Sequence, residues 1–250
     1  MIKKIVFFIL VSFILQSCAN KKDIFYYQDI DRNSKDQISY FPSTVQINDI
    51  LYISISALNP ETAEPFNIVQ GTANVGSKLQ GYLVTHDGTI VFPILGNVTA
   101  AGKTVIELQD TLKKILTDGS YIKDPIVSVR IINNKFTILG EVASPGTYNY
   151  EEQNLSLNQA LGMAGDLTIN GIRKEVLLIR EVNGTRTYVH LDLTSSKWFD
   201  SPYYFVKQND VIIVNPNPVK VTSSGYLNSL GSVLGFVSFA LTIYLLINNN

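Results

Sequence analysis

The residue best placed to do chemistry in this 250-residue chain is Cys18, which is its only cysteine. It cannot form an internal disulfide, and no second thiol is available for a thiolate metal site. A thiolate is a nucleophile that can be modified covalently, and Cys18 lies just after an apolar stretch that runs from Ile5 to Leu15. The position therefore indicates a modification at a membrane surface, with a buried or stray cysteine as the structural alternative.

The stretch before Cys18 has the layout of a secretory signal peptide. Lys3 and Lys4 give it a positive start, and a short apolar segment follows. As a helix, residues 5–15 would span about 16 Å, which is too short for a hydrocarbon core about 30 Å thick. We therefore expect this stretch to direct secretion and not to cross the membrane.

The end of the stretch reads Leu15-Gln16-Ser17-Cys18, which resembles the lipobox of bacterial lipoproteins. In such proteins the signal is cut just before the cysteine, and the cysteine carries lipid. The resemblance implies that residues 1–17 are a lipoprotein signal peptide, that cleavage falls between Ser17 and Cys18, and that residues 18–40 are a lipidated tether. Several acyl chains anchor a protein stably, and Ala19 is not an acidic retention signal, so the outer membrane is the favoured destination.

A second apolar run, residues 230–247, reads LGSVLGFVSFALTIYLLI. Its length of about 18 residues is just enough to cross a hydrocarbon core, so a transmembrane helix is expected at 227–247. The small side chains fall on one narrow stripe at 100° per residue, where they let helices approach closely in lipid or face water inside a ring of helices. This helix-packing stripe consists of Gly231, Gly235, Ser238 and Thr242. A buried core helix is the alternative, although apolar residues occur on almost every face.

The remaining residues offer little for catalysis. The chain has two histidines, His86 beside an Asp-Gly turn and His190 in an alternating strand pattern. A metal site or general base usually needs two or more convergent groups, and no nucleophile elbow, helical carboxylate pair or Gly-rich phosphate loop is present. The formal net charge of −1 does not provide the basic face that nucleic acid requires. We therefore expect no enzyme activity, no metal, no cofactor and no nucleic-acid partner.

The first half of the body predicts one α+β unit. "VQINDILYISIS" is a turn at Asn48-Asp49 that leads into a strand. Asp87-Gly88 between apolar segments predicts a hairpin, and Pro93 and Gly96 end its second strand. Thr104 and Glu107 form a capping box for a helix, and residues 126–132 form a further strand after Pro125.

The second half predicts a β-grasp-like unit. Residues 136–150 form two strands around Pro145-Gly146, and Ser156 with Gln159 caps a helix that ends at Gly165. A hairpin around Asn183-Gly184 covers residues 175–193. The segment "KQNDVIIV" then repeats the earlier Asn-Asp turn and strand at Asn209-Asp210.

The order of these motifs resembles the outer-membrane polysaccharide export lipoprotein family, an export domain followed by a soluble-ligand-binding β-grasp (SLBB) domain. The family often has Gly where this chain has Asn48 and Asn209, but Asn tolerates the same backbone angles. The matching segments are Asn48-Asp49-Ile50-Leu51, Asp87-Gly88-Thr89-Ile90 with Pro93 and Gly96, Gly102-Lys103-Thr104 with Glu107, Gly140-Glu141-Val142 with Pro145-Gly146, Ala160 to Gly165, Val176 to Arg180, Leu191-Asp192-Leu193 and Asp210-Val211-Ile212.

The resemblance implies an α+β fold with an N-terminal lipoprotein signal and a C-terminal transmembrane helix. It places the polysaccharide export domain at 41–134 and the SLBB β-grasp domain at 135–194. It places closing strands that pack back on the export domain at 195–222.

The family also implies a function and partners. Subunits would form a homo-oligomeric ring whose terminal helices cross the outer membrane, as a portal for capsular or extracellular polysaccharide. Most of the mature chain would lie in the periplasm, and an inner-membrane polysaccharide copolymerase with its tyrosine kinase would be the partner.

Two other interpretations stay open. A glycan-binding or scaffolding lipoprotein without a pore could use the aromatic groups Trp198-Phe199 and Tyr203-Tyr204-Phe205 to stack on sugars, although such clusters more often form core or subunit interface. Tyr148 and Tyr150 on one strand allow the same choice, so no sugar-binding residue is assigned. Alternatively, the terminal helix could be a plain anchor in the inner membrane.

Overall fold

The computed structural model describes residues 21–31, 33, 35–68, 81–182 and 184–223, and seven helical residues further on, at 231, 234, 235, 237–239 and 242. The expected signal peptide at 1–17, Cys18 and most of the expected transmembrane helix at 227–247 lie outside the described residues. Within the described ranges, no helix has the length and apolarity needed to cross a membrane.

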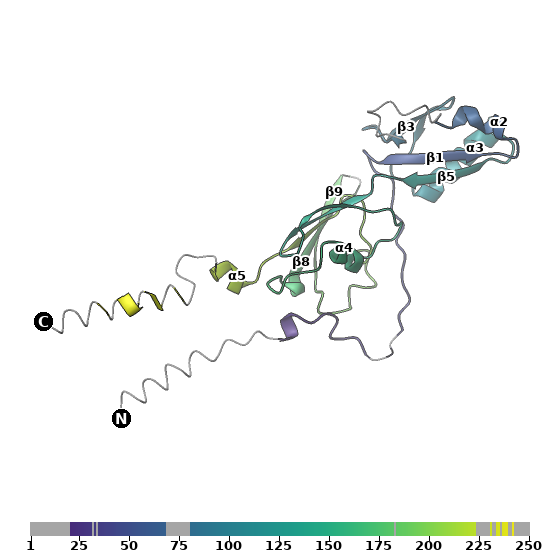
Figure 1. Cartoon of the computed structure of the whole chain (residues 1–250). Helices are drawn as coiled ribbons and strands as arrows, with labels where there is room; N and C mark the ends of the chain where they lie inside the picture. Colours follow the sequence, from purple (N-terminus) through teal and green to yellow (C-terminus); the bar gives the residue numbers. More distant parts are fainter. Residues whose placement is uncertain are drawn as a thin grey trace.

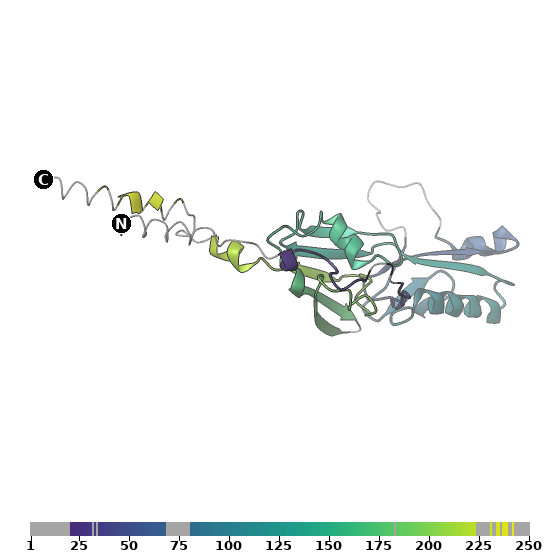
Figure 2. The same ribbon diagram turned by 90° about the horizontal axis from the view of Figure 1, so that it is seen from below.

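Two lobes follow each other along the molecule, each around its own hydrophobic cluster (Figures 1 and 2). The first lobe, residues 44–132, has its core between Val45 and Val129 in the sequence. The second lobe, residues 135–216, has its core between Phe136 and Val214. The mixed α/β character expected from the sequence is confirmed.

The first lobe contains a three-stranded antiparallel sheet in the order β2-β1-β5. Helix α3 begins after a capping box between Thr104 and Glu107, as predicted, and buries Leu108, Leu112 and Leu116 at helical spacing. The elements of this lobe are β1 (Ile50–Ser56), α2 (Pro60–Ala63), η2 (Glu64–Phe66), β2 (Tyr82–Leu83), β3 (Thr89–Phe92), β4 (Gly96–Thr99), α3 (Val105–Asp118) and β5 (Ile126–Ile131).

The turn at Asp87-Gly88 forms, but its strands differ from the predicted hairpin. Thr85 donates its backbone N–H to the carbonyl of Thr89, and Gly88 has φ +74°. Strand β2 before the turn pairs with β1, whereas β3 after it pairs with β4. The turn therefore carries the chain from one sheet to another.

The second lobe contains a five-stranded mixed sheet in the order β7-β6-β10-β8-β9. The predicted capping box of Ser156 with Gln159 starts α4, and Gly165 follows its end with φ +75°. The hairpin between β8 and β9 is confirmed by the pair Val182 and Thr185. The elements are β6 (Lys135–Gly140), β7 (Gly146–Asn149), α4 (Leu157–Met163), η3 (Arg173–Glu175), β8 (Val176–Val182), β9 (Thr185–Leu191), β10 (Val211–Val214) and α5 (Pro218–Ser223).

One expectation is corrected here. Residues 195–222 were expected to pack back on the export domain, but β10 lies in the middle of the second sheet, parallel to β6 and antiparallel to β8. Its alternate residues Ile212 and Val214 are fully buried in the second core, which is the physical reason for this pairing. Gly140 at the end of β6 has φ +92° and touches the backbone of Val214, where a side chain would have no room.

Candidate functional site

Residues 21–31, which we call the strap, belong to the tether expected at 18–40, and the structure places them against the second lobe. They begin with the short 3-10 helix η1 (Lys21–Asp23) and then run along the second lobe. Tyr27 donates its backbone N–H to the carbonyl of Leu193 at 3.2 Å, and Gln28 donates to that of Thr194 at 2.7 Å. The segment that follows Cys18 is therefore held to the second lobe from Asp23 onward.

Aromatic rings fasten the strap. The ring of Tyr27 lies 5.0 Å from Phe199 and 6.4 Å from Trp198, centroid to centroid, and its hydroxyl donates to the side-chain oxygen of Asn158. Tyr26 donates its hydroxyl to Asp166 at 2.5 Å, and the guanidinium of Arg173 lies 5.2 Å above its ring. Aromatic pairs of this kind contribute about 0.5–1.5 kcal/mol each beyond their buried area.

Charged and polar groups lock the two ends of the strap. Lys174 pairs with Asp23 at 2.6 Å, and Asp29 accepts hydrogen bonds from the hydroxyl of Ser195 and the backbone N–H of Ser196 at 2.6 and 2.7 Å. The hydrogen bonds from Ser195 and Ser196 lower the pKa of Asp29. Burial raises the pKa of Tyr27 to about 12, so its hydroxyl stays protonated and continues to donate.

The aromatic residues at 198–205, which could have formed a sugar platform, lie in the second core and against the strap. Trp198 and Phe205 are buried, and Tyr203, Tyr204 and Phe199 pack against the second core. Tyr40, further along the chain, stacks on Phe205 with a centroid distance of 5.4 Å. The rings proposed as a sugar platform are therefore used for core packing and for holding the protein's own N-terminal segment.

The junction between the lobes is polar and is built from two copies of one turn. In each copy an Asn with positive φ precedes a buried Asp, whose carboxylate accepts the backbone N–H three residues earlier. The first copy is Gln46 to Asp49, and the second is Lys207 to Asp210. Both Asn residues adopt the angle that Gly often supplies in the family, φ +71° at Asn48 and +63° at Asn209.

Side chains from the linker tie the two turns together. Asn133 accepts the backbone N–H of Ile50 and donates to the carbonyl of Asn48, and its own carbonyl accepts Gln208 at 3.0 Å. Gln208 in turn accepts the backbone N–H of Lys135 at 2.7 Å. The path from β5 to β6 is therefore fixed on both sides, which sets how the lobes are placed relative to each other.

The two buried aspartates differ in whether a positively charged side chain pairs with their carboxylate. Asp210 forms a bidentate ion pair with Arg180, with distances of 2.9 and 2.7 Å. Asp49 is equally buried, but its Oδ1 has no hydrogen-bond partner among the described residues. Burial raises the pKa of Asp49 to about 6, against the opposing effect of the Gln46 N–H and the Gln208 amide.

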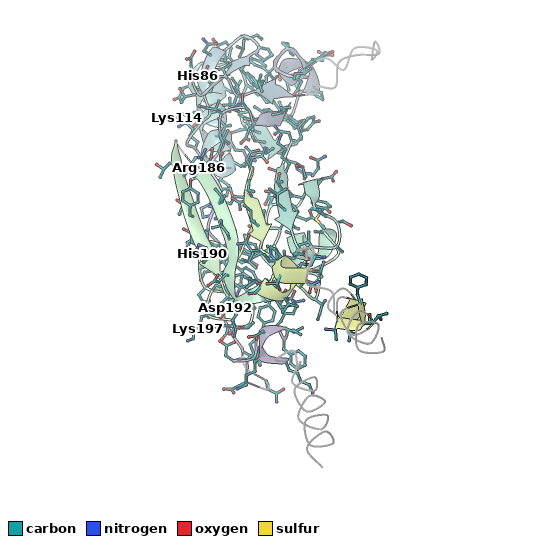
Figure 3. All side chains as sticks on the ribbon, turned by 90° about the vertical axis from the view of Figure 1, so that its left-hand side faces the viewer. His86, Lys114, Arg186, His190, Asp192 and Lys197 are labelled. Carbon is teal, nitrogen blue, oxygen red and sulfur yellow. The ribbon has the colours of Figure 1, made fainter. Side chains whose placement is uncertain are left out.

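The histidines do not converge on a site. Figure 3 shows His86 on the first lobe and His190 on the second, well separated. The part of the chain that the structure describes holds no group of His, Cys, Asp and Glu able to bind a metal ion.

The described members of the helix-packing stripe are helical and exposed. The hydroxyl of Ser238 donates to the carbonyl of Gly235 at 3.0 Å, and that of Thr242 donates to the carbonyl of Ser238 at 2.8 Å. A Cβ atom added to Gly235 would meet nothing within 4 Å. Both hydroxyls are thus satisfied within the helix, which lets this face remain available for packing in an apolar medium.

Comparison with known families agrees with this architecture. Residues 42–132 match the model of the polysaccharide biosynthesis/export protein family, and residues 135–190 match the SLBB domain. The chain therefore carries a polysaccharide export domain followed by an SLBB domain. The first match covers the first lobe and the second match covers most of the second lobe, whereas strand β10 and the strap lie outside both matches.

Two relatives share this similarity. The EPS I polysaccharide export outer membrane protein EpsA of Ralstonia solanacearum is 27% identical over 150 residues, covering 58% of this chain and 38% of that protein. The protein of the same name from Ralstonia nicotianae is 27% identical over 140 residues, covering 54% and 36%. The chain thus spans well under half the length of these relatives. Both relatives are named as outer membrane proteins.

Some features of the candidate site were missed from the sequence. Tyr26 and Tyr27 are adjacent aromatic residues in an otherwise polar segment, which was the available signal for the strap. The partner of Arg180 could not be identified, because the pair joins residues 30 positions apart in the chain. Cys18 and Ser17 remain a sequence-based expectation, since both lie outside the described residues.

Proposed function

We propose that the protein is an outer-membrane lipoprotein that forms an oligomeric portal for export of capsular or extracellular polysaccharide. The observation that carries the proposal is the order of an export domain and an SLBB domain in one chain, together with similarity to proteins named for EPS I export at the outer membrane. Cys18 is the lipid anchor, and cleavage before it removes residues 1–17.

The portal requires several subunits. A single helix at 227–247 cannot enclose a pore, so its copies line the passage together, and the stripe of Gly231, Gly235, Ser238 and Thr242 sets their close approach. The mature chain lies mostly in the periplasm. It receives polysaccharide from an inner-membrane copolymerase with its tyrosine kinase, and no bond in the polymer is made or broken by this protein.

The alternative of a glycan-binding lipoprotein without a pore has less support. Its sugar platform was the aromatic group at 198–205, and Tyr27 of the strap lies against Trp198 and Phe199 in that group.

The test is to extract the mature protein in mild detergent and measure its native mass and its shape by negative-stain microscopy. We expect a closed ring with a central lumen and a narrow collar. A monodisperse monomer would contradict the portal. As a control on the anchor, Cys18→Ala should leave an uncleaved precursor without lipid, and normal acylation of this variant would refute the lipoprotein assignment.

A further inference from the structure

Both ends of the folded part leave the molecule at the same place. Helix α5 continues directly from the last strand of the second lobe, and η1 opens the strap on that lobe. Figures 1 and 2 both show η1 and α5 at the end of the second lobe that points away from the first lobe. We call this the basal end.

One loop joins the two exits at the basal end. Asn170 accepts the backbone N–H of Asn217, just before α5, at 2.7 Å. A few residues later in the same loop, Arg173 lies over the ring of Tyr26 and Lys174 pairs with Asp23, both in the strap. The strap, the loop at 168–174 and α5 therefore form one continuous surface.

This surface exposes large apolar side chains that the fold does not bury. Four large apolar side chains from its three segments are exposed by more than half: Phe25 at 58%, Ile169 at 64%, Val219 at 71% and Val221 at 57%. Lysines accompany them, since η1 contains Lys21 and Lys22 and α5 contains Lys220. The one acidic residue of these two helices, Asp23, pairs with Lys174.

Apolar side chains mixed with lysines are the composition of surfaces that lie in a membrane interface, where the lysines meet lipid phosphates. The sequence adjoining the exits agrees. Cys18 stands three residues before η1, a reach of at most about 11 Å, and the apolar run at 230–247 begins shortly after α5.

We propose that the basal end of the second lobe lies directly on a phospholipid surface, with Phe25, Ile169, Val219 and Val221 inserted among the head groups of anionic lipids. The proposal rests on the proposed function, because it takes the acylated Cys18 and the terminal run as the membrane attachments. It adds that the folded lobe itself binds lipid and is not suspended from flexible linkers.

The experiment uses the full-length mature protein in vesicles of phosphatidylethanolamine and phosphatidylglycerol. An environment-sensitive thiol probe is attached in turn to Ile169→Cys and Val219→Cys, with Val91→Cys as the matched control. Val91 is 65% exposed on β3 of the first lobe. We expect blue-shifted emission and quenching by head-group-level lipid quenchers at 169 and 219, and aqueous emission at 91.

The contribution of the lysines to lipid binding is tested in the same vesicles. Lys21→Glu should lower the ratio of inserted to aqueous probe at residue 169 by about fivefold or more, because each lysine near an anionic surface contributes about that factor. Lys114→Glu on α3 is the matched control, since Lys114 is exposed and lies on the first lobe, away from the basal end (Figure 3). This control should leave the ratio unchanged.

The outcomes separate the two proposals. Aqueous emission at both 169 and 219, or insertion at only one of them, would overturn the basal lipid surface while leaving export untouched. Labelling of the parent protein, which has only Cys18, would show a free thiol and would refute the lipid anchor itself. Insertion that does not depend on phosphatidylglycerol would overturn the role of the lysines in the proposal.

Discussion

The ion pair between Arg180 and Asp210 gives the sharpest test of the second lobe. Arg180 is 7% exposed and Asp210 is fully buried, and the guanidinium also donates to the carbonyls of Pro202 and Phe205 at 2.7 and 2.8 Å. Arg180→Met keeps an unbranched apolar stem but leaves the carboxylate buried and without its counter-charge. Breaking a buried pair in this way costs about 3–5 kcal/mol, so the free energy of unfolding should fall by about that amount.

The assay can report on this lobe alone. Trp198 is the single tryptophan of the chain and is buried in the second core, so its fluorescence during urea unfolding follows the second lobe. Arg180→Met combined with Asp210→Asn should cost clearly less than the sum of the single changes, because the unpaired charge is gone. Arg186→Met is the control, since its pair with Glu181 is exposed on both sides, and it should change little.

A loss below about 1 kcal/mol for Arg180→Met would refute the reasoning, because it would mean that water reaches Asp210 and solvates its charge. Additive costs in the double variant would refute it as well. They would show that packing around the guanidinium, and not charge compensation, determines the effect.

Three further predictions concern the junction, the strap and the stripe. The pKa of Asp49 is raised to about 6, so the contribution of Asp49 to the free energy of unfolding is most favourable below pH 4 and is lost as the pH rises through 6. Asp49→Asn should therefore remove about 2–3 kcal/mol of the pH dependence of stability. Urea unfolding between pH 4.5 and 7.5 measures this, and an unchanged profile of stability against pH would contradict it. Tyr27→Ala should release the strap and destabilise the second lobe by about 1–3 kcal/mol. Phe25→Ala, at an exposed position, should not destabilise this lobe. Equal effects of the two variants in thermal unfolding would argue against a docked strap. Gly235→Leu should weaken the oligomer in detergent and reduce polysaccharide export, because a branched side chain fills the stripe; Leu234→Ile is the control, and a native oligomer mass for Gly235→Leu would exclude the stripe as a contact.

Local signals in the sequence were sufficient for much of the fold. Both capping boxes, at Thr104 and Ser156, form as predicted because the contacts involved lie within four residues. The Asn-Asp turns and the β8–β9 hairpin are local for the same reason. The order of these motifs also indicated an export domain followed by an SLBB domain, and the family models match both.

Non-local pairing was not predictable in the same way. The sequence marks residues 211–214 as an apolar strand, but any buried sheet could accept such a strand, and only packing against Ile138 and Leu178 selects the second one. The strap shows the same limit, since its polar residues resemble a linker until Leu193, Thr194 and Phe199 are brought beside it.

The placement of β10 has a consequence for the order in which the two lobes fold. A chain that emerges from its N-terminus delivers residues 44–132 before the second lobe, and the first lobe can close from these alone. The second sheet stays open between β6 and β8 until Val211–Val214 emerges, and the strap waits for Leu193 to Phe199 before it can dock. Until then, unpaired strand edges of the kind that promote aggregation stay exposed. The second lobe, which also holds the N-terminal strap, is therefore completed last, and its open strand edges are the part of the folding chain that a chaperone would protect.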